Sequence, residues 1–273
     1  PGAKVGVPLF VTLMDDADPA VRMRVLQALA DAGPQAVPAM IEALKNDAVS
    51  YWACLVLREM GPDAALAVPA LTEKLADPHT EIRRGAALAL ASIGVEAAPA
   101  AEKLAGLLAD DAARIPATYA LGCIGQIPKD VEATVRENAH GDNPLLATVS
   151  LWALARTHQD DAQLRKEAIE TLVGRLKDAD PYLRSAAARG LASLPPTPEI
   201  TVPAMEKLLA DADETTVCHA LDALATLGEP AVSGLVNALK HKKLRPHVVT
   251  ILGRIGPAAA SATPSLVALI HDE

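Results

Sequence analysis

This sequence contains few aromatic side chains: one Phe, three Tyr and two Trp among 273 residues. It also lacks the long Val, Ile, Thr and Tyr alternations that are typical of β-strands. Ala and Leu dominate instead. Both favour helices, and the small Ala side chain lets helix axes approach closely. The sequence therefore predicts an all-α protein with a core of Ala and Leu.

Positive charge is also in short supply. Lys and Arg number 25 against 34 Asp and Glu, which gives a net charge of −9 and an isoelectric point of about 5.3. An acidic surface repels phosphate backbones, so we expect no nucleic-acid partner. The one basic run, KHKKLR at 240–245, is expected to be a solvated turn, with a contact to an acidic partner as the alternative.

Long hydrophobic runs are missing too. The longest uncharged run, 255–270, is interrupted by Pro257 and Pro264, so we expect no membrane span. No signal peptide is recognisable. Unpaired cysteines favour the cytoplasm, and export of a longer parent protein stays an alternative. We expect a monomer. The sequence starts without Met as PGAKVGVPLF, which resembles GPAAASATPSLV near its other end. We therefore expect it to be a piece of a longer polypeptide.

The three cysteines, Cys54, Cys123 and Cys218, lie far apart in the sequence. Their odd number and the lack of a CxxC motif argue against a disulfide framework or a zinc site. Each lies in an apolar helical stretch, so we expect all three to be buried as small hydrophobic side chains. We expect no metal and no other cofactor.

The sequence does contain a repeat of roughly 30 residues. Each unit consists of a proline, an apolar helix, Leu-x-Asp, a turn, and a second apolar helix that ends in Gly. A Gly after the last helical turn takes the left-handed conformation that closes a helix. Eight such closing positions predict eight helix pairs: Gly33, Gly61, Gly94, Gly125, His158, Pro195, Gly228 and Gly256.

The turn inside several pairs has its own signal, which is Asp or Asn followed by Pro at 18–19, 143–144 and 180–181. The Asp or Asn side chain is expected to cap the second helix, and Pro suits the first helical position. A single pair cannot bury its apolar stripe, but stacked neighbours share a continuous core. We therefore expect one array over residues 1–273.

The same residue types recur at matching positions of the units. They are Leu13, Asp15, Val21, Arg22, Leu29 and Gly33; Leu75, Asp77, Ile82, Arg83, Leu90 and Gly94; and Leu176, Asp178, Leu183, Arg184 and Leu191.

This pattern resembles HEAT repeats, in particular the short bacterial type found in phycobilin lyases. The resemblance covers nearly the whole chain and implies a right-handed α-α superhelical solenoid of about eight HEAT-like helix pairs. In this family the turn Asp and the following Arg commonly form a polar ladder between repeats. That implies the pairs Asp15–Arg22, Asp77–Arg83 and Asp178–Arg184, with Arg114 and Arg245 as partial cases.

A search for catalytic motifs finds none. Metal-dependent hydroxylases built from similar repeats have paired His-Glu dipeptides, but none of the seven histidines here precedes Glu. HExxH, P-loop and GxSxG motifs are also missing. The carboxylate pairs at 15–16, 110–111 and 160–161 fall in predicted turns, where they are expected to be caps and turn formers. We therefore expect no enzymatic activity.

The second helices carry an outward stripe at the positions equivalent to Ala20, Arg24, Gln27 and Asp31, opposite an apolar stripe that faces the core. In HEAT-type solenoids the second helices line the concave face. We expect this stripe to bind a partner, because aromatic and Arg side chains are the usual anchors of interfaces. The expected residues are Trp52, Tyr119, Trp152, Tyr182, Arg156, Arg189, His219 and Asp222.

Two points on this stripe stay open. Either Tyr51 or Trp52 faces outward in the second unit, and a one-residue error in the alignment would place the rings in the core. Cys123 also falls on the stripe, which conflicts with its expected burial. The first hypothesis for function is a non-catalytic scaffold that binds a protein or peptide segment along its concave face. The alternative is a phycobilin-lyase-like subunit or chaperone that binds a tetrapyrrole or another small ligand.

Overall fold

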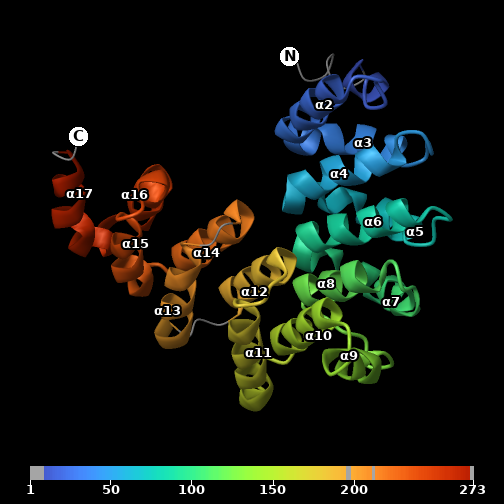
Figure 1. The fold of residues 1–273 in the computed structure, drawn as a ribbon. Coiled ribbons are helices and arrows are strands. Elements are labelled where there is room, and N and C mark those ends of the chain that lie inside the picture. The colour runs from blue at the N-terminus through green and yellow to red at the C-terminus, as the bar shows by residue number, and fades with distance from the viewer. Residues whose placement is uncertain (1–8, 195–197, 211–212, 271–273) are drawn as a thin grey trace. The chain divides into compact units, whose positions relative to one another are not determined.

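The computed structural model describes residues 9–194, 198–210 and 213–270 (Figure 1). Every regular element in these residues is a helix, so the prediction of an all-α fold is confirmed. The chain divides into two compact units, Pro1–Asp160 and Asp161–Glu273. The expectation of one array over both units stays a prediction.

The first unit consists of successive helix pairs, in which each second helix packs against the second helix of the next pair (Figure 1). The second helices are α2 (Pro19–Asp31), α4 (Ser50–Met60), α6 (Thr80–Ile93), α8 (Arg114–Ile124) and α10 (Pro144–Thr157); the first helices are α3 (Val37–Ala43), α5 (Val68–Lys74), α7 (Ala101–Gly106) and α9 (Glu132–Ala139); the 3-10 helices are η1 (Gly33–Ala36), η2 (Gly61–Ala67), η3 (Gly94–Ala100) and η4 (Leu107–Ala109). The short 3-10 helices η1, η2 and η3 connect successive pairs, and η4 lies between the two helices of one pair.

The second unit repeats the same arrangement. Its second helices are α12 (Pro181–Ser193), α14 (Glu214–Leu227) and α16 (Arg245–Ile255); its first helices are α11 (Ala162–Arg175), α13 (Pro198–Leu208), α15 (Val232–Ala238) and α17 (Thr263–Ile270); its 3-10 helices are η5 (Glu229–Ala231), η6 (Lys242–Leu244) and η7 (Gly256–Ala262).

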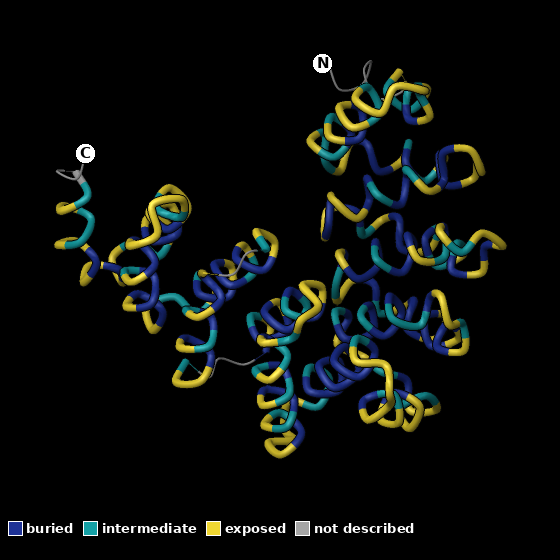
Figure 2. The backbone as a smooth tube through the Cα atoms, viewed as in Figure 1, coloured by how far each residue is buried: buried dark blue, intermediate teal, exposed yellow. Residues whose placement is uncertain are grey.

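The core recurs with the repeat. One Leu of each second helix is almost inaccessible, and small Ala side chains surround it, so helices of neighbouring pairs pack closely. Figure 2 shows buried backbone in the second helices of both units and exposed residues gathered at the turns. This confirms the predicted inward stripe. The Leu residues are Leu29, Leu57, Leu90, Leu121, Leu154, Leu191, Leu224 and Leu252.

Glycine ends second helices at six predicted positions, but the predicted left-handed helical conformation is found at Gly125, whereas four others combine positive φ with ψ between −130° and −137°. All six glycines with positive φ in the described residues are the predicted closing positions, with φ between 59° and 80°. L-residues with a side chain rarely adopt this conformation, which explains why Gly stands there. His158 closes α10 with φ −115° instead, and its main-chain N–H donates to Leu154 O at 2.9 Å. Pro195, the remaining predicted position, lies outside the described residues.

The predicted Asp-Pro and Asn-Pro turns are helix caps. The side chains of Asp18 and Asp180 each accept from the main-chain N–H two residues later at 2.8 Å, and Asn143 accepts from Leu145 N at 3.1 Å. Pro follows each cap at the start of the helix. The three turns therefore direct the chain into α2, α10 and α12.

The implied Asp–Arg ladder needs correction. In five turns an Arg side chain donates to the main-chain oxygen six residues earlier, so the contact lies within one turn. In the first turn Asp16, and not Asp15, supplies that oxygen. The side chains of the turn Asp residues are occupied by main-chain N–H groups two residues later. The five donors are Arg22, Arg83, Arg114, Arg184 and Arg245.

In the first unit an ion pair joins two successive turns. The Arg83 guanidinium donates to Asp110 Oδ2 from Nε at 2.9 Å and from Nη2 at 2.6 Å. The same Arg83 also donates to the main-chain oxygens of Asp77 and Pro78. This charge-assisted bond links the turn before α6 to the turn before α8 and holds the pKa of Asp110 below its usual range.

The expectation that all three cysteines are buried holds only for Cys54. Burial raises the pKa of the Cys54 thiol to about 12. Cys54 lies against Gly85, where a Cβ would come within 3.1 Å of the Cys54 Cβ. Cys123 is half-buried and Cys218 is exposed, because both fall on the outward face of their helices. None of the three forms a disulfide.

Candidate functional site

The predicted outward stripe is partly open and partly closed. Tyr182, Arg189 and Asp222 are exposed, and the exposed fraction of Tyr182 is 78%. The closed part includes the aromatic positions of α4, α8 and α10 in the first unit and His219 of α14 in the second unit. Trp52, Tyr119, Arg156 and His219 are half-buried, and Trp152 is buried.

Trp152 is a packing residue, so its placement on an exposed surface was wrong. Its exposed fraction is 5%, and its ring stacks on that of Tyr119 with centroids 5.3 Å apart. It also fills the space beside Gly122, where a Cβ would come within 2.5 Å of Trp152 Cζ3. The helical periodicity of α10 does not predict the burial of Trp152, because the space that accepts its ring lies on the neighbouring helix α8.

Arg156 completes this contact between α8 and α10. Its guanidinium lies over the Trp152 ring at 5.7 Å, and its Nε donates to Gly122 O at 3.1 Å. Arg and Trp favour this arrangement because the ring face is electron-rich. Tyr119, Trp152 and Arg156 therefore join two repeats, and their predicted role in partner binding is not supported by exposure.

In the second pair, Tyr51 is 37% exposed and Trp52 is half-buried. The Trp52 ring meets the Tyr51 ring edge at 5.1 Å and the Arg22 guanidinium at 5.3 Å. It joins α4 to α2.

In the second unit, His219 connects two second helices. Its Nδ1 lies 2.9 Å from Ser185 Oγ, which joins α14 to α12. Burial lowers the pKa of His219, and the positive charge of Arg189 lowers it further against the opposing charges of Asp222 and Asp213. The imidazole is therefore held in its neutral form.

Two adjoining cavities lie between α14 and α16, with volumes of about 340 Å³ and 520 Å³. Both are lined by Asp222, Ile251 and Arg254, so they form one groove along the two helices. Several lining residues occupy the predicted outward stripe, although only Asp222 was singled out from the sequence. The others of the stripe are Thr226, His247, Thr250 and Arg254.

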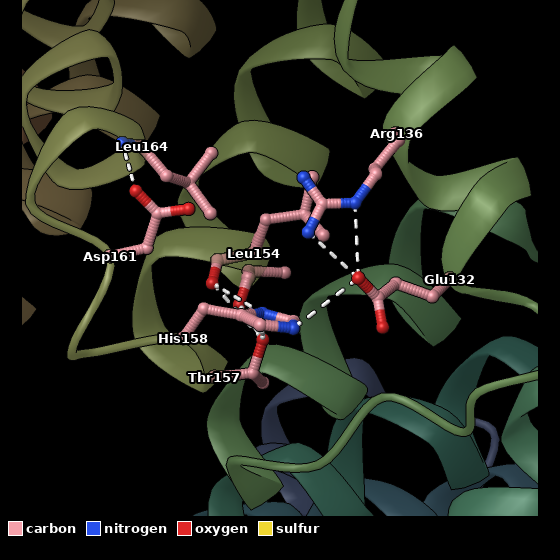
Figure 3. Close-up of polar contacts among 8 residues, drawn as sticks. Glu132, Arg136, Leu154, Thr157, His158, Asp161 and Leu164 are labelled. Carbon is pink, nitrogen blue, oxygen red and sulfur yellow. Dashed lines mark hydrogen bonds and ion pairs between the residues drawn. The ribbon is translucent and has the colours of Figure 1, made fainter.

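A cluster in the first unit resembles an acid–base pair but has a structural role (Figure 3). Glu132 Oε1 accepts from Arg136 at 2.7 Å and 3.0 Å and lies 3.3 Å from His158 Nε2. The Arg136 hydrogen bond holds the pKa of Glu132 below its usual range, and the charge of His158 adds to this. The cluster fastens α9 to the end of α10, where His158 replaces the usual glycine.

Metal-ligand geometry is missing from the part of the chain that the structure describes: no group of three or more His, Cys, Asp or Glu side chains could hold a metal ion there. Nor is any described helix long and apolar enough to cross a membrane.

The sequence matches the family described as HEAT repeats at residues 7–68, 45–122 and 169–245. The chain belongs to the HEAT-repeat family. Its helix pairs, its closing glycines and the Arg side chains that bond within the turns are thus features of a HEAT-repeat chain. No curated protein matches the sequence.

Several solved structures are similar to this HEAT-repeat chain. An engineered protein is 22% identical, with 97% of this chain and 81% of that chain covered and a TM-score of 0.44. Computationally designed armadillo repeat proteins for modular peptide recognition are 18% identical over 81% of this chain and 99% of that chain, with a TM-score of 0.33. Human deoxyhypusine hydroxylase is 17% identical over 92% and 96% of the two chains, with a TM-score of 0.39.

Proposed function

We propose that this HEAT-repeat chain is a non-catalytic scaffold that binds a protein or peptide segment along the exposed stripe of its second helices. The observation that supports the proposal is the exposed stripe on α12, α14 and α16. It presents Tyr182 and Arg189 on α12, Asp222 on α14 and Arg254 on α16. Tyr and Arg are enriched at protein interfaces, where they supply contact area and hydrogen bonds at the same time.

The proposed binding surface differs in position from the one expected from the sequence. The aromatic residues expected to form the binding surface of the first unit are engaged in contacts between repeats, as described for Trp152 and Trp52. Tyr182 is different because the residue is 78% exposed while its main-chain N–H is held by the Asp180 cap. A large ring on a rigid helix start loses little conformational freedom on binding, which favours it as an anchor.

A random peptide display library selected on the immobilised chain tests this function. We expect peptides to be recovered, and Tyr182→Ala to weaken their binding about tenfold, the effect of a moderate interface anchor. Lys166→Ala is the matched control, because Lys166 is an exposed residue of the first helix α11. Failure to recover any peptide, or equal binding to both variants, would contradict the proposal.

The phycobilin-lyase-like alternative stays a prediction. It requires the chain to bind a bilin, which a shift in the absorption spectrum of added bilin would reveal.

A further inference from the structure

The junction between α14 and α16 is more open than the other junctions of second helices within the two units. Within the second unit α14 packs along α12, but it makes few contacts with α16, and the first helix α15 lies against both. At the α8–α10 junction the outward positions are filled by Trp152 and its partners. At the α14–α16 junction the equivalent positions of α16 are His247, Thr250 and Arg254, which line the cavities instead.

The groove has the size of a ligand site. Its two parts measure about 340 Å³ and 520 Å³, within the range of roughly 300–1,000 Å³ that is usual for binding pockets. Leu221 and Ile251 line it with apolar atoms from the two helices. An apolar side chain that entered between them would replace water against hydrocarbon on both sides, which is favourable.

Charges of both signs face the groove. Asp222 of α14 and Arg254 of α16 line both cavities, and Glu229 lines the second. Among the described residues, no hydrogen bond or ion pair engages the carboxylate of Asp222 or the guanidinium of Arg254. Because a ligand can satisfy both groups, the groove matches a segment with opposite charges at corresponding places. A polyanion would meet two carboxylates, so a nucleic acid fits poorly.

We propose that the α14–α16 groove binds an extended protein segment in which an apolar residue stands between a basic and an acidic residue. The apolar side chain enters between Leu221 and Ile251, the basic one meets Asp222, and the acidic one meets Arg254. This inference rests on the proposed scaffold function and adds where the segment binds and what sequence it carries.

The peptides selected on the immobilised chain test the charge pattern. We expect a basic–apolar–acidic core among them and about tenfold weaker binding to Asp222→Lys and to Arg254→Glu, roughly the loss of one close charge pair. The control is Lys243→Glu, which reverses an exposed charge of η6 that does not line the groove. A selection repeated on the Asp222→Lys, Arg254→Glu double variant should reverse the order of charges in the core.

Cys218 locates the bound peptide independently. This exposed thiol lines the first cavity, whereas Cys54 is buried in the first unit. A saturating peptide should slow the alkylation of Cys218 by a maleimide at least about fivefold and leave that of Cys54 unchanged, as expected when a bound ligand covers one thiol only. Mass spectrometry of the digested chain measures both rates.

The outcomes separate the two proposals. Peptides that bind without protecting Cys218, with equal affinity for the groove variants and Lys243→Glu, would overturn the groove while the scaffold function stands. If no peptide is recovered, both proposals are contradicted.

Discussion

At the scale of single residues, position along the repeat decides what each side chain does. The closing glycines have positive φ, and four of them also have ψ between −130° and −137°. Residues that have a Cβ atom strongly disfavour this backbone conformation. Ordinary glycines of the same chain lie inside helices. The contrast allows the effect of the backbone conformation to be separated from the effect of adding a methyl group.

Gly256→Ala and Gly253→Ala form such a comparison at the end of α16. Neither added Cβ meets an atom within 4 Å, but only Gly256 has positive φ. We expect Gly256→Ala to lower the free energy of unfolding by about 1–3 kcal/mol through backbone strain. Gly253→Ala should raise it by about 0.5–1 kcal/mol, because Ala favours the helix. Urea denaturation followed by circular dichroism measures both effects. Equal effects of the two substitutions would contradict backbone strain as the cause of the cost at Gly256.

His219 makes the stability of the second unit depend on pH. Burial and Arg189 lower its pKa in the folded state below the usual value of 6.5. The unfolded chain therefore binds a proton first as the pH falls, so this contribution to stability is present above about pH 6.5 and is lost below it.

We expect wild-type protein to lose more stability than His219→Gln between pH 7.5 and 5.0, since Gln does not titrate in this interval. Urea denaturation at both pH values measures the difference, and NMR titration of the imidazole gives the pKa directly. A folded-state pKa above 6.5 would contradict the prediction.

At the scale of elements, contacts between successive second helices hold the repeats together. Trp152 of α10 enters the space beside Gly122 of α8, and Arg83 connects the turn before α6 to Asp110. One contact is apolar and close-packed, while the other is polar and partly exposed. Removing each contact should therefore lower the free energy of unfolding by a different amount, and the two losses should depend differently on salt.

Trp152→Ala should cost about 3–5 kcal/mol, because it leaves a cavity between α8 and α10. Gly122→Ala should cost about 1–3 kcal/mol, because the added methyl collides with the same ring. The double variant should cost less than the sum, since the methyl then occupies part of the cavity. Urea denaturation of the four proteins measures the coupling; strict additivity would show that the two residues do not pack together.

Asp110→Asn should cost about 1 kcal/mol, a modest value because the Arg83 and Asp110 side chains are 19% and 23% exposed. The cost should shrink in high salt, since partly exposed charges are screened. Asp111→Asn serves as control, because the Asp111 carboxylate is 92% exposed and pairs only within its own turn. Denaturation at low and high salt compares them, and equal losses would contradict a special role for Asp110.

At the scale of the whole molecule, repeats interact mainly with their neighbours in the sequence, so stability is expected to be local. The division into two compact units agrees with this picture. The buried Cys54 in the first unit reports on local opening, because its thiol reacts only when the surrounding helices separate.

We expect Gly94→Ala to speed the alkylation of Cys54 about tenfold or more, because it strains the end of the adjacent helix α6. Gly256→Ala, in the second unit, should leave the rate nearly unchanged. Peptide-level mass spectrometry measures the rates. Equal acceleration by both substitutions would show that the chain opens as one cooperative body.

The sequence alone predicted much of this protein. The helix pairs, the six glycine stops, the Asp and Asn caps and the buried Leu of each second helix follow from local backbone preferences and helical periodicity, and all are present in the structure. These features depend on residues close together in the chain, so a single sequence contains the information for them.

Tertiary structure decided which outward positions are free. Trp152 is buried because Gly122, 30 residues earlier, leaves room for its ring, while Tyr182 stays exposed. Arg22 bonds to Asp16 and not to Asp15 because the turn brings that main-chain oxygen to the guanidinium. Periodicity within a helix separates inward from outward faces, but only packing against a neighbouring helix determines which outward side chains meet solvent and can bind a partner.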